Sequence, residues 1–504
     1  MSTEQPESPN LQKKSVDKDL GKLGQVEDAT QQISRKLIGP GLGLLFLAVA
    51  GIFASTQIGN SSESVILIIA AVLGGYMALN IGANDVANNV GPAVGSKALT
   101  IYGALVVAAI FECAGALLAG GDVVKTISKG IIDPNAVASS QIFIWAMLSA
   151  LMASALWVNL ATWIGAPVST THAVVGGVLG AGIASSGLAT VNWPIMGAIA
   201  ASWVISPLLG GVIAAGFLAF IKIFIIYQDD KIAAARRWVP WLIALMVSAF
   251  SAYLMMKGLK RIWKPDMTVV VIGAIAMLLG SWLLLNPAIA RQSEGLENRN
   301  QSLRKLFRYP LICSAALLSF AHGANDVANA VGPLAAILSS AQTGEIAAKV
   351  ELPIWVMLIG GIGISVGLFL FGPRLIIMVG QQITRMNPMR AFCVSLSAAI
   401  TVIIASGLGL PVSSTHIAVG AVFGVGFFRE HFTARSKRRR KYVNTHPEFH
   451  AHGGARKPTD PQELIKRKLV RRSHFLVILA AWLITVPAAA SISAMIFFAI
   501  SMMQ

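Results

Sequence analysis

Long apolar stretches recur along the whole chain, with shorter polar connections between them. The stretches at 37–55, 101–121 and 474–503 reach the length of about 18 apolar residues that a transmembrane helix requires. A β-barrel would show shorter segments in which apolar and polar residues alternate. The pattern therefore predicts an all-α polytopic membrane protein with about 12–13 transmembrane or re-entrant segments. The predicted segments are 38–57, 65–82, 101–121, 141–163, 168–185, 197–226, 239–256, 268–286, 310–331, 353–371, 391–408, 413–428 and 474–501.

Two of these segments, 168–185 and 413–428, are short and begin just after a proline. Proline interrupts a preceding helix and is well tolerated in the first turn of the next one. We therefore expect both to be arms of re-entrant hairpins rather than complete membrane spans.

The chain contains an internal duplication. GANDVAN occurs at 82–88 and again at 323–329, and PVSTTH at 167–172 returns as PVSSTH at 411–416. The two pairs keep their order and have nearly equal offsets, 241 and 244. They predict a first repeat at 65–227 and a second at 310–503, joined by connecting helices and loops at 228–309. An odd number of segments separates the two GANDVAN copies, so the repeats should have inverted topology, as in many secondary transporters.

Charge is concentrated outside the repeated motifs. The formal net charge is +17, and residues 429–473 alone hold fourteen lysines and arginines against four acids. In a membrane protein such a segment is better explained as a cytoplasmic loop that obeys the positive-inside rule and contacts anionic lipid than as a nucleic-acid site. The same rule places the N-terminus inside, although the basic loop 257–265 then falls outside. We expect 1–36 to be a polar, disordered extension and 37–58 to be an additional transmembrane helix.

Asp85 and Asp326 occupy matching positions in the two GANDVAN copies. A charged side chain inside the membrane costs at least about 2.5–3.5 kcal/mol, so it is rarely without a function. The adjacent glycines should let the backbone leave the helix and expose carbonyl oxygens. Carboxylate, amide and carbonyl oxygens together would suit Na⁺, or H⁺ with less need for a cage. The alternative is a helix-packing motif with satisfied amides.

The proline motifs favour an anion site. Each places hydroxyls on the first turn of a helix, where free N–H groups and the positive end of the helix dipole attract anions. Ordinary N-capping by Ser169 and Ser413 is the alternative, but a cap needs only one hydroxyl. The candidate anion ligands are Ser169, Thr170, Thr171, Ser413, Ser414 and Thr415.

Four further side chains have an open role. His172, His416 and His322 are either proton carriers or buried hydrogen-bonding residues. Glu112 lies alone in an apolar segment and is a candidate extra cation ligand, but no matching acid exists in the second half.

Both GANDVAN copies, PVSTTH, PVSSTH and ISKGIID (127–133) resemble motifs of the PiT family of inorganic phosphate transporters. The resemblance implies inverted repeats, a transport domain with helical hairpins, a scaffold domain and a homodimer. It places Asp85, Asp326, Asn88 and Asn329 at the substrate and cation sites. It also implies that Asn84 and Asn325 help to hold cations and that the six hydroxyls contact phosphate.

The predicted function is cation-coupled symport of inorganic phosphate into the cell by alternating access, with Na⁺ favoured over H⁺ and bound at Asp85 and Asp326. The protein would lie in the inner or plasma membrane, with its N-terminus and 429–473 cytoplasmic and its C-terminus outside, and would need no resident cofactor. A permease for sulfate or another oxyanion remains an alternative. A membrane-embedded enzyme acting on phosphate esters would gather its acids at one membrane face, and the chain has neither an HExxH motif nor a P-loop.

Overall fold

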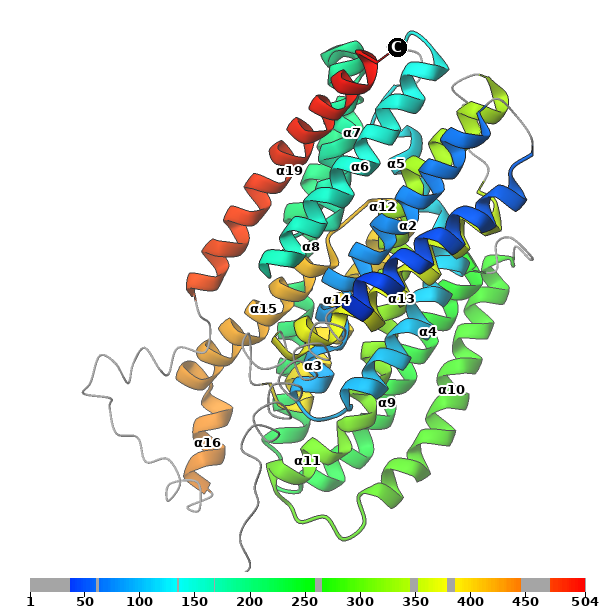
Figure 1. The fold of residues 1–504 in the computed structure, drawn as a ribbon. Coiled ribbons are helices and arrows are strands. Elements are labelled where there is room, and N and C mark those ends of the chain that lie inside the picture. The colour runs from blue at the N-terminus through cyan, green and yellow to red at the C-terminus, as the bar shows by residue number, and fades with distance from the viewer. Residues whose placement is uncertain are drawn as a thin grey trace, which may run out of the picture.

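The computed structural model describes residues 37–59, 63–133, 136–166, 168–258, 265–344, 352–378, 386–445 and 472–503 (Figure 1). The predicted extension 1–36, residues 446–471 of the basic loop and most of the loop 257–265 lie outside these residues. Within the described ranges the protein is helical and contains only one isolated β-bridge, between Ile132 and Val191.

Every predicted membrane segment corresponds to a helix. Eleven helices among the described residues are long and apolar enough to cross a membrane, and α7 and α15 correspond to the two segments predicted as re-entrant arms. The all-α polytopic prediction is therefore confirmed. The elements are an N-terminal helix Leu37–Gln57, then α2 (Ser64–Asn84), α3 (Val86–Gly95), α4 (Ile101–Ala119), α5 (Gly121–Lys129), α6 (Ser140–Ile164), α7 (Thr170–Ser186), α8 (Trp193–Ile221), α9 (Lys231–Tyr253), α10 (Met267–Gln292), α11 (Asn300–Leu306), α12 (Arg308–Thr343), α13 (Ile354–Met378), α14 (Pro388–Gly407), α15 (Ser414–Arg435), α16 (Lys437–Thr445) and α19 (Arg472–Ser501).

The helices of the two halves pack in matching pairs. In the first half α2 packs against α13 of the second, and α12 of the second packs against α4 of the first. The same exchange joins α7 to α19 and α15 to α8. Two large buried apolar clusters each draw residues from both halves, and α12 contributes to both, with its earlier turns in one and its later turns in the other. The two copies therefore pack together instead of forming separate cores.

Two glycines of the GANDVAN motifs lie where paired helices cross. A Cβ atom at Gly82 would lie 1.9 Å from the Ile364 carbonyl oxygen, and one at Gly323 would lie 2.1 Å from the Glu112 carbonyl oxygen. Only glycine allows backbones to approach so closely. The prediction that these glycines release the backbone from the helix is wrong for the second copy, which lies inside the uninterrupted α12. In the first copy Asp85, at the α2–α3 junction, keeps a helical conformation with φ −88° and ψ −36°.

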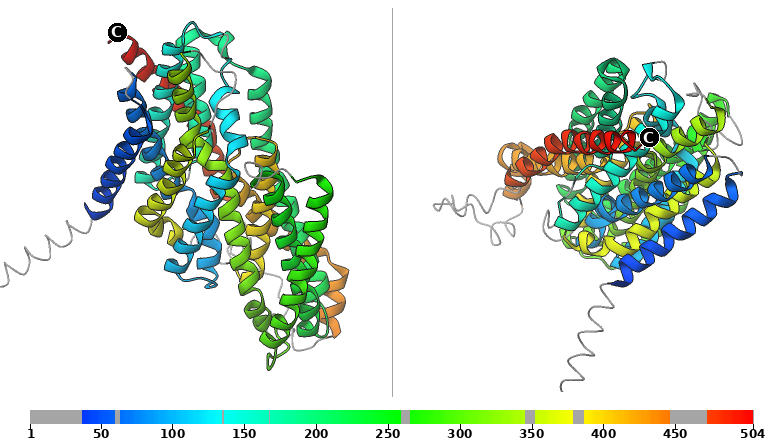
Figure 2. Two further views of the ribbon diagram at one scale, coloured as in Figure 1. Left: turned by 90° about the vertical axis from the view of Figure 1, so that its right-hand side faces the viewer. Right: turned by 45° about the horizontal axis from the view of Figure 1, so that its top comes forward.

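Two hairpins carry the proline motifs. In the first, α6 packs against α7, and in the second α14 packs against α15. Gly165 (φ 74°) and Gly409 (φ 70°) turn the chain in the left-handed region at the two tips. The tips meet inside the molecule, since the rings of His172 and His416 have centroids 4.6 Å apart. From there α7 runs toward the end that carries the C-terminus and α15 toward the opposite end (Figures 1 and 2).

The basic segment begins inside regular structure. Residues 429–435 continue α15 beyond its predicted end at 428, and 437–445 form α16. The segment predicted as a loop from 429 onward is therefore largely helical as far as Thr445. α16 packs through Tyr442, whose hydroxyl lies 2.5 Å from Lys231 Nζ at the start of α9. α11 and α16 lie at the same end of the molecule, opposite the C-terminus (Figure 1).

Candidate functional site

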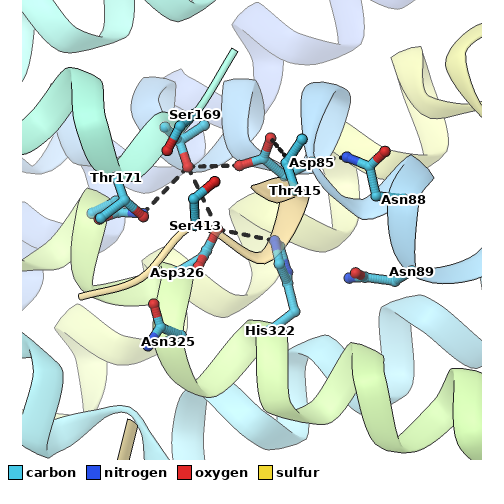
Figure 3. A network of polar contacts seen from close by, with 12 residues as sticks. Asp85, Asn88, Asn89, Ser169, Thr171, His322, Asn325, Asp326, Ser413 and Thr415 are labelled. Carbon is cyan, nitrogen blue, oxygen red and sulfur yellow. Dashed lines mark hydrogen bonds and ion pairs between the residues drawn. The ribbon is translucent and has the colours of Figure 1, made fainter. Parts of the chain in front are cut away.

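Both GANDVAN motifs and both hairpin tips converge on one buried polar cluster (Figure 3). Asp85 at the α2–α3 junction is 2% exposed and Asp326 in α12 is 1% exposed. Thr170 and Thr415, on the first turns of α7 and α15, are as deeply buried. The duplicated acids and the duplicated hydroxyl motifs, which lie far apart in each half of the sequence, thus form a single site.

Hydroxyls from both hairpin tips hold the Asp85 carboxylate. Thr170 Oγ1 donates to Asp85 Oδ2 at 2.6 Å, and Thr415 Oγ1 donates to Asp85 Oδ1 at 3.3 Å. Asp326 Oδ2 lies 3.5 Å from the same Thr170 hydroxyl. Because a hydroxyl has a single proton, Thr170 serves Asp85 first and leaves Asp326 the weaker contact.

The second asparagine of each GANDVAN motif binds the hairpin of the other repeat. Asn88 Nδ2 donates to Thr415 Oγ1 at 2.9 Å, and Asn329 Nδ2 donates to Thr171 Oγ1 at 3.1 Å. Asn329 also lies 3.3 Å from Thr170 Oγ1. These bonds cross between the halves in a symmetric way, so each hairpin tip is held by a helix of the opposite copy.

The first asparagine of each motif binds the hairpin of its own repeat. Asn84 Nδ2 donates to Thr162 Oγ1 at 3.0 Å, and Asn325 Nδ2 donates to Ser406 Oγ at 2.9 Å. Sequence reasoning missed Thr162 and Ser406. Their separation equals the offset of 244 between the two proline motifs, so an alignment of the repeats beyond those motifs would have identified them.

The two predicted capping serines do cap their helices. Ser169 Oγ accepts from the His172 N–H at 3.2 Å, and Ser413 Oγ accepts from the His416 N–H at 3.4 Å. Capping therefore explains the first hydroxyl of each motif. The buried hydroxyl of Ser414, next in sequence, has no hydrogen-bond partner among the described residues.

A buried chain of polar side chains runs to Asp326 alone. His322 Nε2 lies 3.0 Å from Asp326 Oδ2, and His322 Nδ1 lies 2.6 Å from Glu112 Oε2. Asn89 Nδ2 donates to Glu112 Oε1 at 2.8 Å. Glu112 thus contacts the site through His322 instead of reaching the space between the two aspartates.

The matching positions in the other half are apolar. At the offset of 241, Ile81 corresponds to His322 and Ala330 to Asn89. The backbone of Ile364 packs against Gly82 in the same way that the backbone of Glu112 packs against Gly323, so Ile364 occupies the position that corresponds to Glu112. The polar chain of Asn89, Glu112 and His322 therefore exists on the Asp326 side of the site, and apolar residues take its place on the Asp85 side.

The cluster offers oxygen ligands for a cation. Asp85, His322 and Asp326 each place one ligand atom within 4.8 Å of the others. Asp326 Oδ1 and Asn329 Oδ1 are buried acceptors without a hydrogen-bond donor among the described residues. Hard cations prefer oxygen, so the carboxylates suit Na⁺ better than the imidazole does. The hydroxyls and free helix N–H groups nearby suit an oxyanion.

Buried acids beside hydroxyl-bearing helix ends, enclosed by exchanged helices of a duplicated chain, define a membrane transporter. Residues 81–493 match the model of the phosphate transporter family, and the chain belongs to that family. The chain is 43% identical to a "Putative phosphate permease" of Helicobacter pylori over 96% of its length and 99% of that protein. It is 34% identical to a protein of the same description from Pyrococcus abyssi, over 86% of this chain and 97% of that one.

A solved structure described as "The sodium-dependent phosphate transporter" superposes on this fold with a TM-score of 0.77. It is 34% identical and covers 87% of this chain and 100% of its own. These comparisons confirm the predicted family and identify the chain as a multi-pass membrane transporter. The enzyme alternative is set aside, because the family and its relatives are phosphate transporters and permeases.

Proposed function

We propose that the protein couples entry of inorganic phosphate to entry of Na⁺, by alternating access between the repeats 65–227 and 310–503. The observation that carries this proposal is the pair of buried aspartates, Asp85 and Asp326, that share the Thr170 hydroxyl. One acid comes from each repeat, and hydroxyls from both hairpin tips lie beside them.

The charges explain why the cation is required. A carboxylate and a phosphate oxyanion about 4 Å apart repel by ~4 kcal/mol at an effective dielectric constant of about 20. Na⁺ at Asp85 and Asp326, with Asn84 and Asn325 contributing, removes this repulsion. Each ion then raises the affinity for the other by the same factor, which is the thermodynamic basis of coupling.

The proposed phosphate ligands lie around the aspartates. They are Asn88, Ser169, Thr170, Thr171, Asn329, Ser413, Ser414 and Thr415. The hydroxyls of Thr170 and Thr415 and the amides of Asn88 and Asn329 now bond one another or the Asp85 carboxylate, so phosphate would replace these contacts with its own. His172, His416 and His322 remain either buried hydrogen-bonding residues or proton carriers. Of the three, His322 contacts the acids Glu112 and Asp326.

Alternating access follows from the opposed hairpins. The tips are joined directly by Thr171 Oγ1, which donates to the Val412 carbonyl at 3.0 Å. Because α7 and α15 lead to opposite ends of the molecule (Figure 1), withdrawal of one tip would open the site to one side only. The burial of all four central side chains supports a closed arrangement between these two states.

Uptake by proteoliposomes tests the proposal. An inward Na⁺ gradient should drive labelled phosphate above equilibrium, and an inward proton gradient in Na⁺-free medium should not. Protein-free liposomes and K⁺ in place of Na⁺ are the controls. Equal uptake with the proton gradient alone would assign H⁺ as the coupled ion, and no concentrative uptake with either would contradict symport.

The assembly is proposed to be a homodimer in the inner or plasma membrane, surrounded by lipid. α10 supports this, because only 6% of its most apolar window is buried within one chain and the remaining apolar surface needs lipid or a second subunit. The mass of the purified protein, measured by light scattering with the detergent contribution subtracted, distinguishes the dimer from a monomer.

A further inference from the structure

A large pocket with several cationic lining residues opens at the end of the molecule that carries α11 and α16. Its volume is about 1270 Å³, and it lies between the end of α3, the start of α12, the end of α13 and the start of α14. α3 runs from the central site to the pocket, because Asn88 lies in its first turn and Ser96, which lines the pocket, is its C-terminal cap. Eight residues of helix span about 12 Å.

The pocket is lined by several cations, and none of the described residues that line it is acidic. Its charged lining residues are Lys97, Arg304, Lys305, Arg308 and Arg390. None of them forms an ion pair within the described part of the chain. So many like charges around one space repel one another, and an anion would relieve that repulsion.

Several of these side chains are held in position rather than free to spread. Arg308 Nε donates to the Ala98 carbonyl at 2.9 Å, and Arg390 Nε donates to Asn387 Oδ1 at 3.2 Å. A guanidinium fixed through Nε still presents its terminal nitrogens, the pair that binds phosphate in bidentate fashion.

Lys97 lies at the C-terminal end of α3 with φ 61°. Glycine or asparagine is usual in this left-handed position, and here the chain carries a lysine that lines the pocket. A lysine at the C-terminal end of a helix also interacts favourably with the helix dipole. This interaction does not explain the left-handed conformation of Lys97, because it is available in other conformations as well.

The positive region continues beyond the pocket. Arg429 lies outside the pocket on α15, the helix that carries the second hairpin tip. Lys222 is 8% exposed and lies over the ring of Phe432, with Nζ 4.5 Å from the centroid. The cations therefore extend from the pocket to the helix that carries the second hairpin tip.

We propose that this pocket is a second anion site that binds a phosphate group. The group belongs either to inorganic phosphate that has left the central site or to the headgroup of an anionic lipid, since both present the same oxyanion to the five cations. Binding at this site should not require Na⁺, because no carboxylate among the described lining residues would repel the anion.

The test compares two double variants that each remove two positive charges from the same end of the molecule. Arg304→Gln with Lys305→Gln acts inside the pocket, and Arg438→Gln with Lys441→Gln acts on exposed residues of α16 outside it. Lys305→Glu alone is a second pocket variant. Size-exclusion profiles and thermal stability check that each variant is folded.

Two binding measurements distinguish the source of the phosphate group. Labelled inorganic phosphate is titrated onto delipidated protein in choline medium, where the absence of Na⁺ weakens the central site. Native mass spectrometry counts phosphatidylglycerol retained from nanodiscs that also contain phosphatidylcholine. We expect the pocket variants to lose about tenfold or more in one of the two measurements, and the control pair to resemble the unmodified protein.

A loss confined to the first measurement identifies free phosphate, and a loss confined to the second identifies the lipid headgroup. The proposal is overturned if the pocket and control pairs behave alike in both measurements, because binding would then reflect diffuse surface charge. Failure of Na⁺-driven uptake in proteoliposomes would contradict the symport proposal and leave this result unaffected.

Discussion

At the scale of single residues, the duplicated aspartates have the same sequence context and different surroundings. Asp85 accepts hydrogen bonds from two threonine hydroxyls. Asp326 contacts one ring nitrogen of His322, and Glu112 contacts the other. A buried charge is stable only when it is paired and hydrogen-bonded, and each acid meets this requirement in its own way.

Replacing either acid by its amide should abolish Na⁺-driven uptake. Asp85→Asn and Asp326→Asn keep the shape of the side chain and remove the charge that attracts the cation. Losing one charged ligand in a buried site costs about 1.5–3 kcal/mol, so phosphate affinity in Na⁺ should fall about tenfold to a hundredfold. Binding of labelled phosphate with and without Na⁺, together with uptake, measures the effect.

The exposed Asp230→Asn is the matched control, because Asp230 only caps α9 at the surface. Normal Na⁺-dependent uptake by either central variant, with the control also normal, would remove the aspartates from the coupling mechanism.

The site should prefer phosphate and arsenate over sulfate. Near neutral pH phosphate keeps at least one O–H, because the second pKa of a phosphate group is about 6. Asp326 Oδ1 has no donor among the described residues and can accept that hydrogen, whereas sulfate brings only acceptors. A buried mismatch of this kind costs about 1–3 kcal/mol, or roughly a hundredfold in affinity at the upper end.

Competition of labelled phosphate uptake by arsenate and sulfate measures this preference. Chloride at the same ionic strength controls for screening. Equal competition by sulfate and arsenate would instead support the sulfate or oxyanion permease.

At the scale of elements, the helix crossings depend on the absence of a side chain. Gly82 and Gly323 let α2 approach α13 and α12 approach α4. The same crossings place the adjacent Asp85 and Asp326 opposite the hairpin tips. Close packing and site geometry are therefore set by the same residues.

Adding a methyl group at these crossings should be strongly destabilising. Gly82→Ala and Gly323→Ala place Cβ 1.9 Å and 2.1 Å from a backbone oxygen, so the helices must separate. Overpacking costs about 1–3 kcal/mol or more, and the displaced aspartates should also lower transport. Thermal unfolding in detergent and phosphate uptake measure both effects.

Gly216→Ala in α8 is the matched control, because a Cβ atom there meets nothing within 4 Å. It should be neutral or slightly stabilising, since alanine has the higher helix propensity. Equal stability of all three variants would show that the crossings tolerate a wider separation.

At the scale of the whole molecule, the two halves of the duplicated chain exchange helices and build their apolar clusters jointly. The basic loop 257–265 was the exception to the expected charge distribution. Its Lys257 is paired, with Nζ 2.6 Å from Asp122 Oδ2 and 2.9 Å from the Gly407 carbonyl. This lysine binds the end of α14 next to the tip of the second hairpin, so it carries little information on topology.

The two ends of α19 should lie on opposite sides of the membrane. Its 30 residues span about 45 Å, which exceeds the hydrocarbon core of about 30 Å. In a background without natural cysteines, Thr445→Cys should react with an impermeant maleimide only after the cells are opened, and Ser501→Cys should react in intact cells. Labelling of both from outside would contradict the cytoplasmic position proposed for α16.

The sequence alone was enough to predict the membrane segments, the duplication and the paired motifs around Asp85 and Asp326. Hydropathy and motif recurrence are properties of short stretches, and they do not depend on what lies opposite. The family followed from the same motifs, and the match over 81–493 confirms it.

Only the tertiary structure decided which partners these residues have. A glycine can either interrupt a helix or allow a neighbouring helix to pack closely, and the backbone that faces it decides which. At Gly323 the facing backbone is that of α4 at Glu112. The exchange of hairpins between repeats, and the one-sided chain from Asn89 through Glu112 and His322 to Asp326, join residues up to 330 positions apart. Such contacts arise from packing in three dimensions, because a buried polar group bonds whichever partner the fold brings within reach.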